Sequence, residues 1–274
     1  MSGPGDPGRP HTARRRFGQH FLHDPAVVTR IVSAIAPRPG DALVEIGPGT
    51  GVLTAALLRE LPAMQAVEID RDLASALAAR YPPSRLELHV TDALRFDFAA
   101  LAREPGELRI AGNLPYNVST PLLFHLLEAR HAIRDMHFML QREVVDRLAA
   151  APGERSYGRL SVMVQTHCRV ESLFRVGAGA FRPPPRVESA VARLLPRDSL
   201  PLPEEHLPAL SRVVAAAFAR RRKTLRNALR GLVGEDELLA TGLDPGARPE
   251  TLGVADFARL AACLAPGSRG PASC

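Results

Sequence analysis

Short apolar runs rich in aliphatic and β-branched residues recur through the first half of the chain. They begin 22 to 28 residues apart, and the segments between them, such as 52–61 and 71–80, have helical periodicity. This alternation is typical of βαβ units and predicts a doubly wound, largely parallel sheet. Ligands bind such sheets beyond the carboxyl ends of the strands, so functional residues are expected there. The predicted strands are residues 42–47, 64–70, 86–92, 108–113 and 136–141.

The pattern changes after residue 150. A Gly/Pro loop is followed by a helical stretch from Arg159, and apolar runs at 170–176 and 189–195 are candidates for antiparallel strands that complete the sheet. A Pro-rich linker covers 196–208, and helical patterns with turns at 231–234 and 244–246 continue to about residue 264. The predicted organisation is a tail (1–12), a catalytic domain (13–197), a small helical domain (205–264) and a second tail (265–274).

Composition excludes several classes of protein. Of the 274 residues, 46% are hydrophobic and 23% are charged, which is enough apolar material for a core and argues against overall disorder. No apolar stretch approaches the roughly 18 residues of a membrane helix, and the N-terminus has no apolar signal segment. Three widely spaced cysteines offer neither a disulfide framework nor a zinc site, and no histidines have metal-ligand spacing. We therefore expect no metal and a reducing, cytoplasmic location.

Positive charge is concentrated within a net charge of +6. Residues 211–230 include basic residues and no acidic one, and Arg14, Arg15 and Arg16 form a second cluster. Such clusters are typical of proteins that bind polyanions, although a solvated helix face in an arginine-rich protein is the alternative. The candidates for nucleic-acid docking are Arg220, Arg221, Arg222, Lys223 and Arg226.

A glycine-rich turn follows the first predicted strand. Gly47 and Gly49 allow a tight turn and a close approach of ligand to backbone. Val52 replaces the third glycine of a dinucleotide fingerprint, and no Gly-Lys-Ser/Thr follows, so the loop suits a pyrophosphate poorly. Glu68 and Asp92 end the next two predicted strands, where acids can bind ribose hydroxyls and an adenine amine. Together they favour S-adenosylmethionine, while helix N-capping is the alternative for either acid alone.

The fourth predicted strand ends in Asn113, Leu114, Pro115 and Tyr116. An exocyclic adenine amine is a poor nucleophile because its lone pair is conjugated into the ring. The Asn113 side-chain oxygen and the Leu114 carbonyl can accept the two N6 hydrogens, while Pro115 keeps the backbone extended and Tyr116 offers a ring for stacking. An ordinary turn is the alternative for such a tetrapeptide. Its place at a strand end favours a site for a target adenine.

Several segments together resemble the bacterial small-subunit ribosomal RNA adenine N6,N6-dimethyltransferase family. The resemblance covers about residues 14–264. The segments are FGQHFL, VEIGPGTG, EID, TDA, NLPYNVSTPLLFHLL, HFMLQREVVDRL, YGRLSVM, AFRPPPRVESAV and FARRRKTLRNAL.

The resemblance implies dimethylation of two adjacent adenosines in the loop of a 3′-terminal hairpin of 16S rRNA within the immature small subunit. It also implies an α/β fold with a Rossmann-like, seven-stranded class I methyltransferase sheet, followed by a small helical domain. We expect the protein to be a monomer. Phe181 resembles the family's second aromatic residue against the target base, opposite Tyr116. At the position of His20, many relatives carry Asn. The cofactor contacts implied by the resemblance are His20, Leu22, Gly47, Glu68, Asp92 and Asn113.

Two other functions remain open from the sequence. A 23S rRNA adenine methyltransferase of the antibiotic-resistance type shares the glycine loop and the Asn-to-Tyr motif, but the long basic element and the full helical tail favour the 16S enzyme. A non-catalytic ribosome assembly factor is the second alternative. Intact Glu68, Asp92 and the segment 113–116 argue against lost catalysis, and binding to a maturing subunit is expected as a second role.

Overall fold

The computed structural model describes residues 20–219 and 223–264. Contacts divide the chain into two compact units, of which the first holds residues up to 141 and 173–192 and the second holds 142–172 and the residues from 193 onward. The segment 142–172 therefore groups with the C-terminal helices. The domain boundaries expected from the sequence, at residues 197 and 205, stay a prediction.

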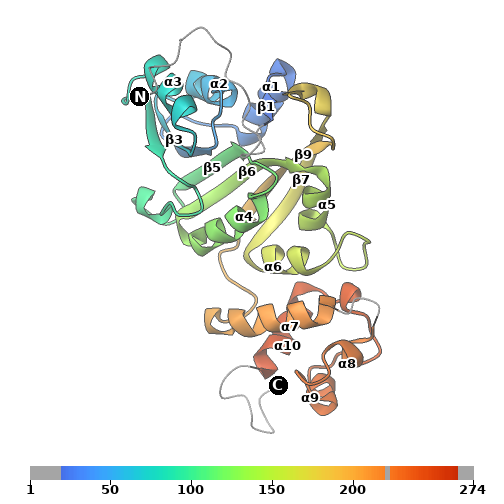
Figure 1. Cartoon of the computed structure of the whole chain (residues 1–274). Coiled ribbons are helices and arrows are strands. Elements are labelled where there is room, and N and C mark those ends of the chain that lie inside the picture. Colours follow the sequence, from blue (N-terminus) through green and yellow to red (C-terminus); the bar gives the residue numbers. More distant parts are fainter. Residues whose placement is uncertain (1–19, 220–222, 265–274) are drawn as a thin grey trace, which may run out of the picture. The chain divides into compact units, whose positions relative to one another are not determined.

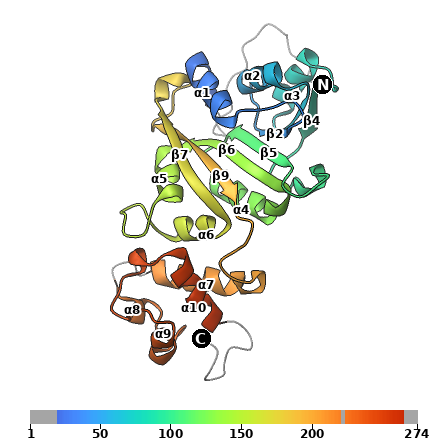
Figure 2. The same ribbon diagram turned by 180° about the vertical axis from the view of Figure 1, so that it is seen from behind.

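Seven strands form one sheet in the order β4-β3-β2-β5-β6-β9-β7, so β4 and β7 are its edges (Figure 2). The pairs β4/β3, β3/β2, β2/β5 and β5/β6 are parallel, as the sequence predicted. The runs expected near 170–176 and 189–195 also join this sheet. Its strands are β2 (Ala42–Ile46), β3 (Met64–Glu68), β4 (Leu86–Val90), β5 (Leu108–Asn113), β6 (Ile133–Gln141), β7 (Cys168–Val176) and β9 (Ser189–Pro196).

Helices alternate with these strands (Figure 1). Their starts follow local sequence: Asp24 caps the first helix by accepting hydrogen bonds from the amides of Ala26 and Val27, and Pro25 occupies the first turn, where its missing N–H has no cost. The helices of the first unit are α1 (Pro25–Ile35), α2 (Val52–Glu60), α3 (Arg71–Arg80) and α4 (Ser119–Glu128).

A two-stranded sheet joins segments that are distant in sequence. Strand β1 (Phe21–Leu22) pairs antiparallel with β8 (Phe181–Arg182), with Phe21 opposite Arg182 and Leu22 opposite Phe181. The amide of His23 extends the pairing by donating to the Ala180 carbonyl at 2.9 Å. The segment before α1 is thereby fixed beside the segment before β9. Sequence periodicity did not predict this pairing.

A buried ionic network ties α1 to the amino ends of the parallel strands. Arg109 on β5 donates to Asp135 on β6 and, at 2.8 Å, to Asp41 before β2. The same guanidinium donates to the Ile35 carbonyl at the end of α1. Each charge therefore has an oppositely charged partner, which offsets the cost of its burial.

The second unit is mainly helical. Tyr157 is fully buried, its hydroxyl donates to the Leu252 carbonyl at 2.8 Å, and its ring meets Phe218, which in turn contacts Phe257. Burial, reinforced by nearby Asp256, raises the pKa of Tyr157 to about 12. The helices of this unit are α5 (Arg142–Ala149), α6 (Arg159–His167), α7 (Leu207–Ala219), α8 (Leu225–Ala228), α9 (Glu235–Ala240) and α10 (Val254–Cys263).

The described part of the basic segment 220–226 is not continuously helical, which the sequence did not predict. Helix α7 ends at Ala219, Lys223 lies in a bend, and Thr224 precedes α8 in an extended conformation. Threonine is favoured at such a position before a helix. Arg220, Arg221 and Arg222 lie outside the described residues.

Within residues 20–219 and 223–264, no helix has the length and apolar character needed to cross a membrane.

Candidate active site

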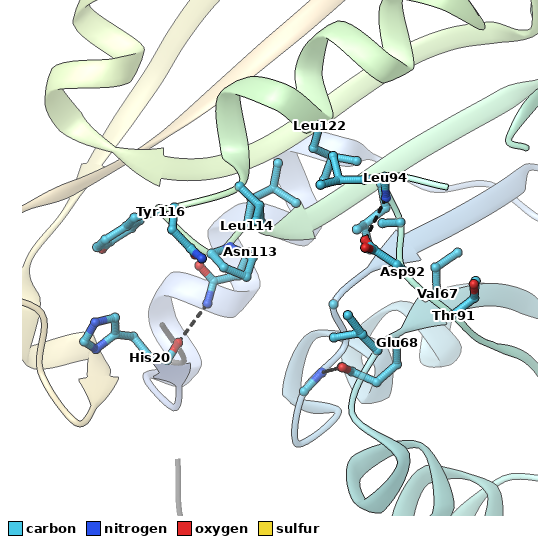
Figure 3. Close-up of a pocket in the computed structure, with 18 of the residues that line it drawn as sticks. His20, Val67, Glu68, Thr91, Asp92, Leu94, Asn113, Leu114, Tyr116 and Leu122 are labelled. Atoms are coloured by element: carbon cyan, nitrogen blue, oxygen red, sulfur yellow. Dashed lines mark hydrogen bonds between the residues drawn. The ribbon is translucent and has the colours of Figure 1, made fainter. Parts of the chain in front are cut away.

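A cavity in the first unit opens at the carboxyl ends of β2, β3, β4 and β5, where the parallel sheet predicts it (Figure 3). Most of the site residues expected from the sequence line it, and all but His20 lie at the carboxyl ends of these four strands. These are His20, Gly47, Gly49, Glu68, Asp92, Asn113, Leu114, Pro115 and Tyr116.

The glycine loop between β2 and α2 has a backbone that side chains would obstruct. Gly49 has φ +58°, and a Cβ there would lie 3.2 Å from the Phe21 ring. Gly51 begins α2 with φ +79°, and a Cβ there would lie 2.5 Å from the Leu77 side chain. Only glycine fits this path without strain. The loop therefore brings bare backbone to the cavity wall.

Glu68 orders this loop from the end of β3. Its two carboxylate oxygens accept the amides of Gly49, at 3.1 Å, and Asp70, at 2.8 Å. Burial raises the pKa of Glu68, while these hydrogen bonds act against that shift. Each carboxylate oxygen has a further lone pair and can accept a ribose hydroxyl. The cap of α3 is Asp70, whose side chain accepts the amide of Asp72, so Glu68 is not the N-cap of that helix.

Asp92 lies two residues beyond the end of β4. One of its carboxylate oxygens accepts the amide of Leu94 at 3.0 Å, which fixes a turn and leaves the other oxygen for an amine donor. Shortly after this turn, the Phe96 carbonyl oxygen lies 2.8 Å from the Nε2 of His125. Because a carbonyl only accepts, Nε2 is the protonated nitrogen of His125. The Phe96 ring also packs against His89, at 4.8 Å between centroids.

Apolar side chains complete this half of the cavity. Ile69 is 46% exposed and lines the cavity beside Glu68. Val67, Leu94 and Leu122 also line it. An apolar surface next to two carboxylates matches an adenosine, which has a flat ring and a polar sugar. The residues present therefore fit the nucleoside part of S-adenosylmethionine.

Asn113 ends β5 in a fixed orientation. Its side-chain nitrogen donates to the His20 main-chain oxygen at 3.0 Å (Figure 3). The side-chain oxygen of Asn113 therefore remains available as an acceptor. The turn into α4 uses other carbonyl groups: Pro115 accepts the amide of Val118 and Tyr116 accepts the hydroxyl of Ser119.

Tyr116 is held at its hydroxyl, which lies 2.8 Å from the Ser189 hydroxyl at the start of β9. Burial raises the pKa of Tyr116, although the hydrogen bond with Ser189 acts against that shift. The phenol is therefore neutral at physiological pH. Its partly buried ring lines the cavity and can stack on a planar base.

Two residues from the sequence prediction lie elsewhere. Phe181 is 2% exposed and Leu22 is 6% exposed, and both belong to the hydrophobic core of the first unit. Neither side chain lines the cavity, and the contact of Phe181 with the target base, which the resemblance implies, stays a prediction. Phe21, next to Leu22, lines the cavity instead.

Two buried residues on either side of the glycine loop were not predicted from the sequence. Glu45 on β2 is 2% exposed and accepts the Thr54 hydroxyl of α2 at 2.6 Å. This bond joins the strand before the loop to the helix after it. Burial raises the pKa of Glu45 to about 7, and nearby Glu68 adds to the shift. An acid inside an apolar strand run was the available sequence signal.

Among the described residues, no group of three or more His, Cys, Asp or Glu side chains could hold a metal ion.

The parallel sheet, the glycine loop and the paired carboxylates define a class I S-adenosylmethionine-dependent methyltransferase. A family model described as ribosomal RNA adenine dimethylase matches residues 10–265. The chain belongs to this family. Its activity is therefore adenine dimethylation of ribosomal RNA with S-adenosylmethionine as the methyl donor, which confirms the family, fold class and cofactor expected from the sequence.

Curated relatives are similar along nearly their whole length. The ribosomal RNA small subunit methyltransferase A of Nitrosococcus oceani is 56% identical, over 91% of this chain and 95% of that protein. The protein of the same name from Pseudomonas savastanoi pv. phaseolicola is 54% identical, over 93% of this chain and 95% of that protein.

Solved structures support the same fold. A dimethyladenosine transferase from Plasmodium falciparum has a TM-score of 0.76 and 26% identity, over 88% of this chain and 96% of that chain. The 23S rRNA methyltransferase ErmE has a TM-score of 0.71 and 25% identity, over 89% of this chain and 99% of that chain.

Proposed function

We propose that this chain methylates the N6 amines of two adjacent adenosines in the loop of a 3′-terminal hairpin of 16S rRNA, giving N6,N6-dimethyladenosine. The observation that carries the proposal is the Asn113 side chain, whose nitrogen is occupied by the His20 carbonyl and whose oxygen is left as an acceptor beside Tyr116. The small-subunit curated relatives favour 16S over 23S rRNA.

The chain's own residues have separate tasks in this proposal. Bound S-adenosylmethionine supplies an activated methyl group, held with its ribose at Glu68 and its adenine amine at Asp92. The Asn113 oxygen and the Leu114 carbonyl accept the two N6 hydrogens of the target base and direct the nitrogen lone pair toward the methyl group. Pro115 keeps that carbonyl in place, and Tyr116 stacks on the base. No side chain has to act as a strong base, because the proton can leave to water.

The substrate in this proposal is 16S rRNA within the immature small subunit. The chain acts as a monomer in the cytoplasm, and its binding to that particle contributes to subunit maturation. Lys223 and Arg226 contribute to RNA docking, together with Arg220, Arg221 and Arg222. Lys223 and Arg226 are exposed, as this role requires.

Methyl transfer from labelled cofactor to undermethylated small subunits tests the proposal, with large subunits assayed in parallel and the modified bases mapped. We expect dimethylation of two adjacent adenosines in small subunits alone. Modification of large subunits instead would favour the 23S alternative, for which the similarity to ErmE is the supporting observation. Tight binding to small subunits without methylation would favour the assembly factor.

A further inference from the structure

His20 is held beside the catalytic strand end by contacts from residues more than 150 positions away. Its Nδ1 lies 2.8 Å from the Pro183 carbonyl, and the following residue, Phe21, pairs with Arg182. Because a carbonyl oxygen only accepts, Nδ1 carries the proton in this contact. The ring is therefore fixed at one edge, and its orientation is set by the segment that follows β8.

The fixed ring lies next to Tyr116. The two ring centroids are 5.7 Å apart, the ring planes are tilted by 31°, and both side chains line the cavity (Figure 3). This distance is within the range of about 4.5–7 Å that is typical of interacting aromatic rings. Each ring is anchored by a polar atom at its edge, His20 at Pro183 and Tyr116 at Ser189. The pair forms a preorganised aromatic corner.

The same residue also orients the group that receives the target amine. The main-chain oxygen of His20 accepts the Asn113 amide, so the ring of His20 and the free oxygen of Asn113 belong to one hydrogen-bonded unit. A base that places its amine at that oxygen therefore comes within reach of both rings. Phe181, which the resemblance implies as a further aromatic contact, is 2% exposed and is not among the residues that line the cavity.

We propose that the His20 imidazole is an aromatic contact for the target adenine, beside Tyr116, and that it positions the base over Asn113. The proposal rests on the function proposed above. Aromatic rings hold extruded bases by stacking, in a way that tolerates different ring types. The ring, rather than its nitrogen atoms, is the part that acts on the base.

Three variants separate the ring from its anchor. His20→Phe keeps a ring and loses the hydrogen bond to Pro183, His20→Asn keeps an N–H donor and loses the ring, and His20→Ala loses both. The control is His23→Ala, which changes an exposed histidine on the same segment that does not line the cavity. Each variant is assayed as the full chain.

The readouts are initial rates of methylation at several concentrations of undermethylated small subunits and saturating cofactor, the cofactor Kd by calorimetry, and a thermal melt. We expect His20→Ala and His20→Asn to lower the subunit-dependent kcat/KM by about tenfold, or about 1.4 kcal/mol. His20→Phe should stay within about threefold of the wild type. His20 is also one of the cofactor contacts that the resemblance implies, so the assay uses saturating cofactor, at which a changed cofactor Kd does not alter the kcat/KM for the subunit.

Two results would overturn the proposal: wild-type kcat/KM in His20→Ala, or equal losses in His20→Phe and His20→Ala accompanied by a lower melting temperature. The second result would make His20 an anchor of the β1–β8 segment only. Failure of the wild type to methylate small subunits would instead overturn the proposed function, and this inference with it. The wild-type arm therefore distinguishes the two failures.

Discussion

The side-chain nitrogen of Asn113 donates to the main-chain oxygen of His20 at 3.0 Å, which joins the end of β5 to the segment before β1. This bond decides which end of the amide is left for a ligand. A methyltransferase for an exocyclic amine needs an acceptor at that point, because the amine presents hydrogens. The fold therefore sets the chemistry of Asn113 through a contact 93 residues away in sequence.

Asn113→Ala should lower turnover by about 10²–10³-fold, the usual cost of removing one closely placed hydrogen-bonding group from an active site. The cofactor Kd should change by only a few-fold, since Glu68 and Asp92 remain. Single-turnover methylation and calorimetry measure the two quantities. Wild-type turnover would remove Asn113 from the mechanism.

Asn113→Asp is a sharper companion variant. It keeps an acceptor oxygen but cannot donate to the His20 carbonyl when it is ionised, so two acceptors would face each other. We expect a turnover loss close to that of Asn113→Ala, together with a lower melting temperature. Full activity in Asn113→Asp would show that the hydrogen bond to His20 does not set the geometry.

Tyr116→Ala should reduce methylation by about tenfold to a hundredfold, because stacking on a base contributes roughly 1–3 kcal/mol. Tyr116→Phe keeps the ring and loses one neutral hydrogen bond, which contributes about 1 kcal/mol, so its effect should be tenfold or less. Ser189→Ala removes the other partner of that bond and should match Tyr116→Phe. Equal losses in Tyr116→Phe and Tyr116→Ala would make the hydroxyl the working part.

Glu68→Ala should raise the cofactor Kd by about tenfold to a hundredfold, because a carboxylate that accepts two ribose hydroxyls contributes roughly 1.5–3 kcal/mol. The variant also frees the Gly49 amide, which loosens the loop. Asp72→Ala is the matched control, since it removes a nearby exposed acid in the first turn of α3. Calorimetry that gives the wild-type Kd for Glu68→Ala would restrict this residue to loop structure.

The sheet and three of the polar site residues were predictable from the sequence. Glu68, Asp92 and Asn113 follow apolar runs with regular spacing, and the carboxyl ends of parallel strands meet at one edge. The alternation of strands with helices and the helical periodicity are local patterns, so they can be identified from the sequence without the structure.

The rest of the site depends on contacts that are distant in sequence. His20, which precedes β1, lies beside Tyr116, and Phe181 of β8 lies in the core. Strands of two residues are too short to give a periodic pattern, so the β1–β8 pairing could not be predicted from the sequence. No pattern in the sequence marks Ser189, whose hydroxyl lies 2.8 Å from the Tyr116 hydroxyl in the fold. The cofactor contact that the resemblance implies for Leu22 stays a prediction, while its neighbour Phe21 lines the cavity.

Arg226 forms an exposed ion pair with Glu235 at 3.1 Å. The proposed role of Arg226 in RNA docking can therefore be tested by a variant that weakens binding and by one that strengthens it. Arg226→Gln should weaken small-subunit binding and reduce the slope of log K against log salt by about 0.7–0.9, because one phosphate is no longer neutralised. Glu235→Gln should strengthen binding, because it leaves the arginine unpaired. Binding measured at several salt concentrations gives both slopes. Unchanged slopes in both variants would place Arg226 outside the interface.

Glu45→Gln should stabilise the protein above neutral pH and have little effect near pH 5. The folded-state pKa of Glu45 is raised from 4.5 to about 7 by burial. Between these values the unfolded chain releases the proton while the folded chain keeps it, so wild-type stability falls as pH rises through that window. The full loss is on the order of 3 kcal/mol. Glutamine is uncharged and can still accept the Thr54 hydroxyl, so the variant avoids this loss. Chemical denaturation at pH 5 and pH 8 measures the difference between variant and wild type, and a difference independent of pH would mean that Glu45 is ionised in the folded protein throughout.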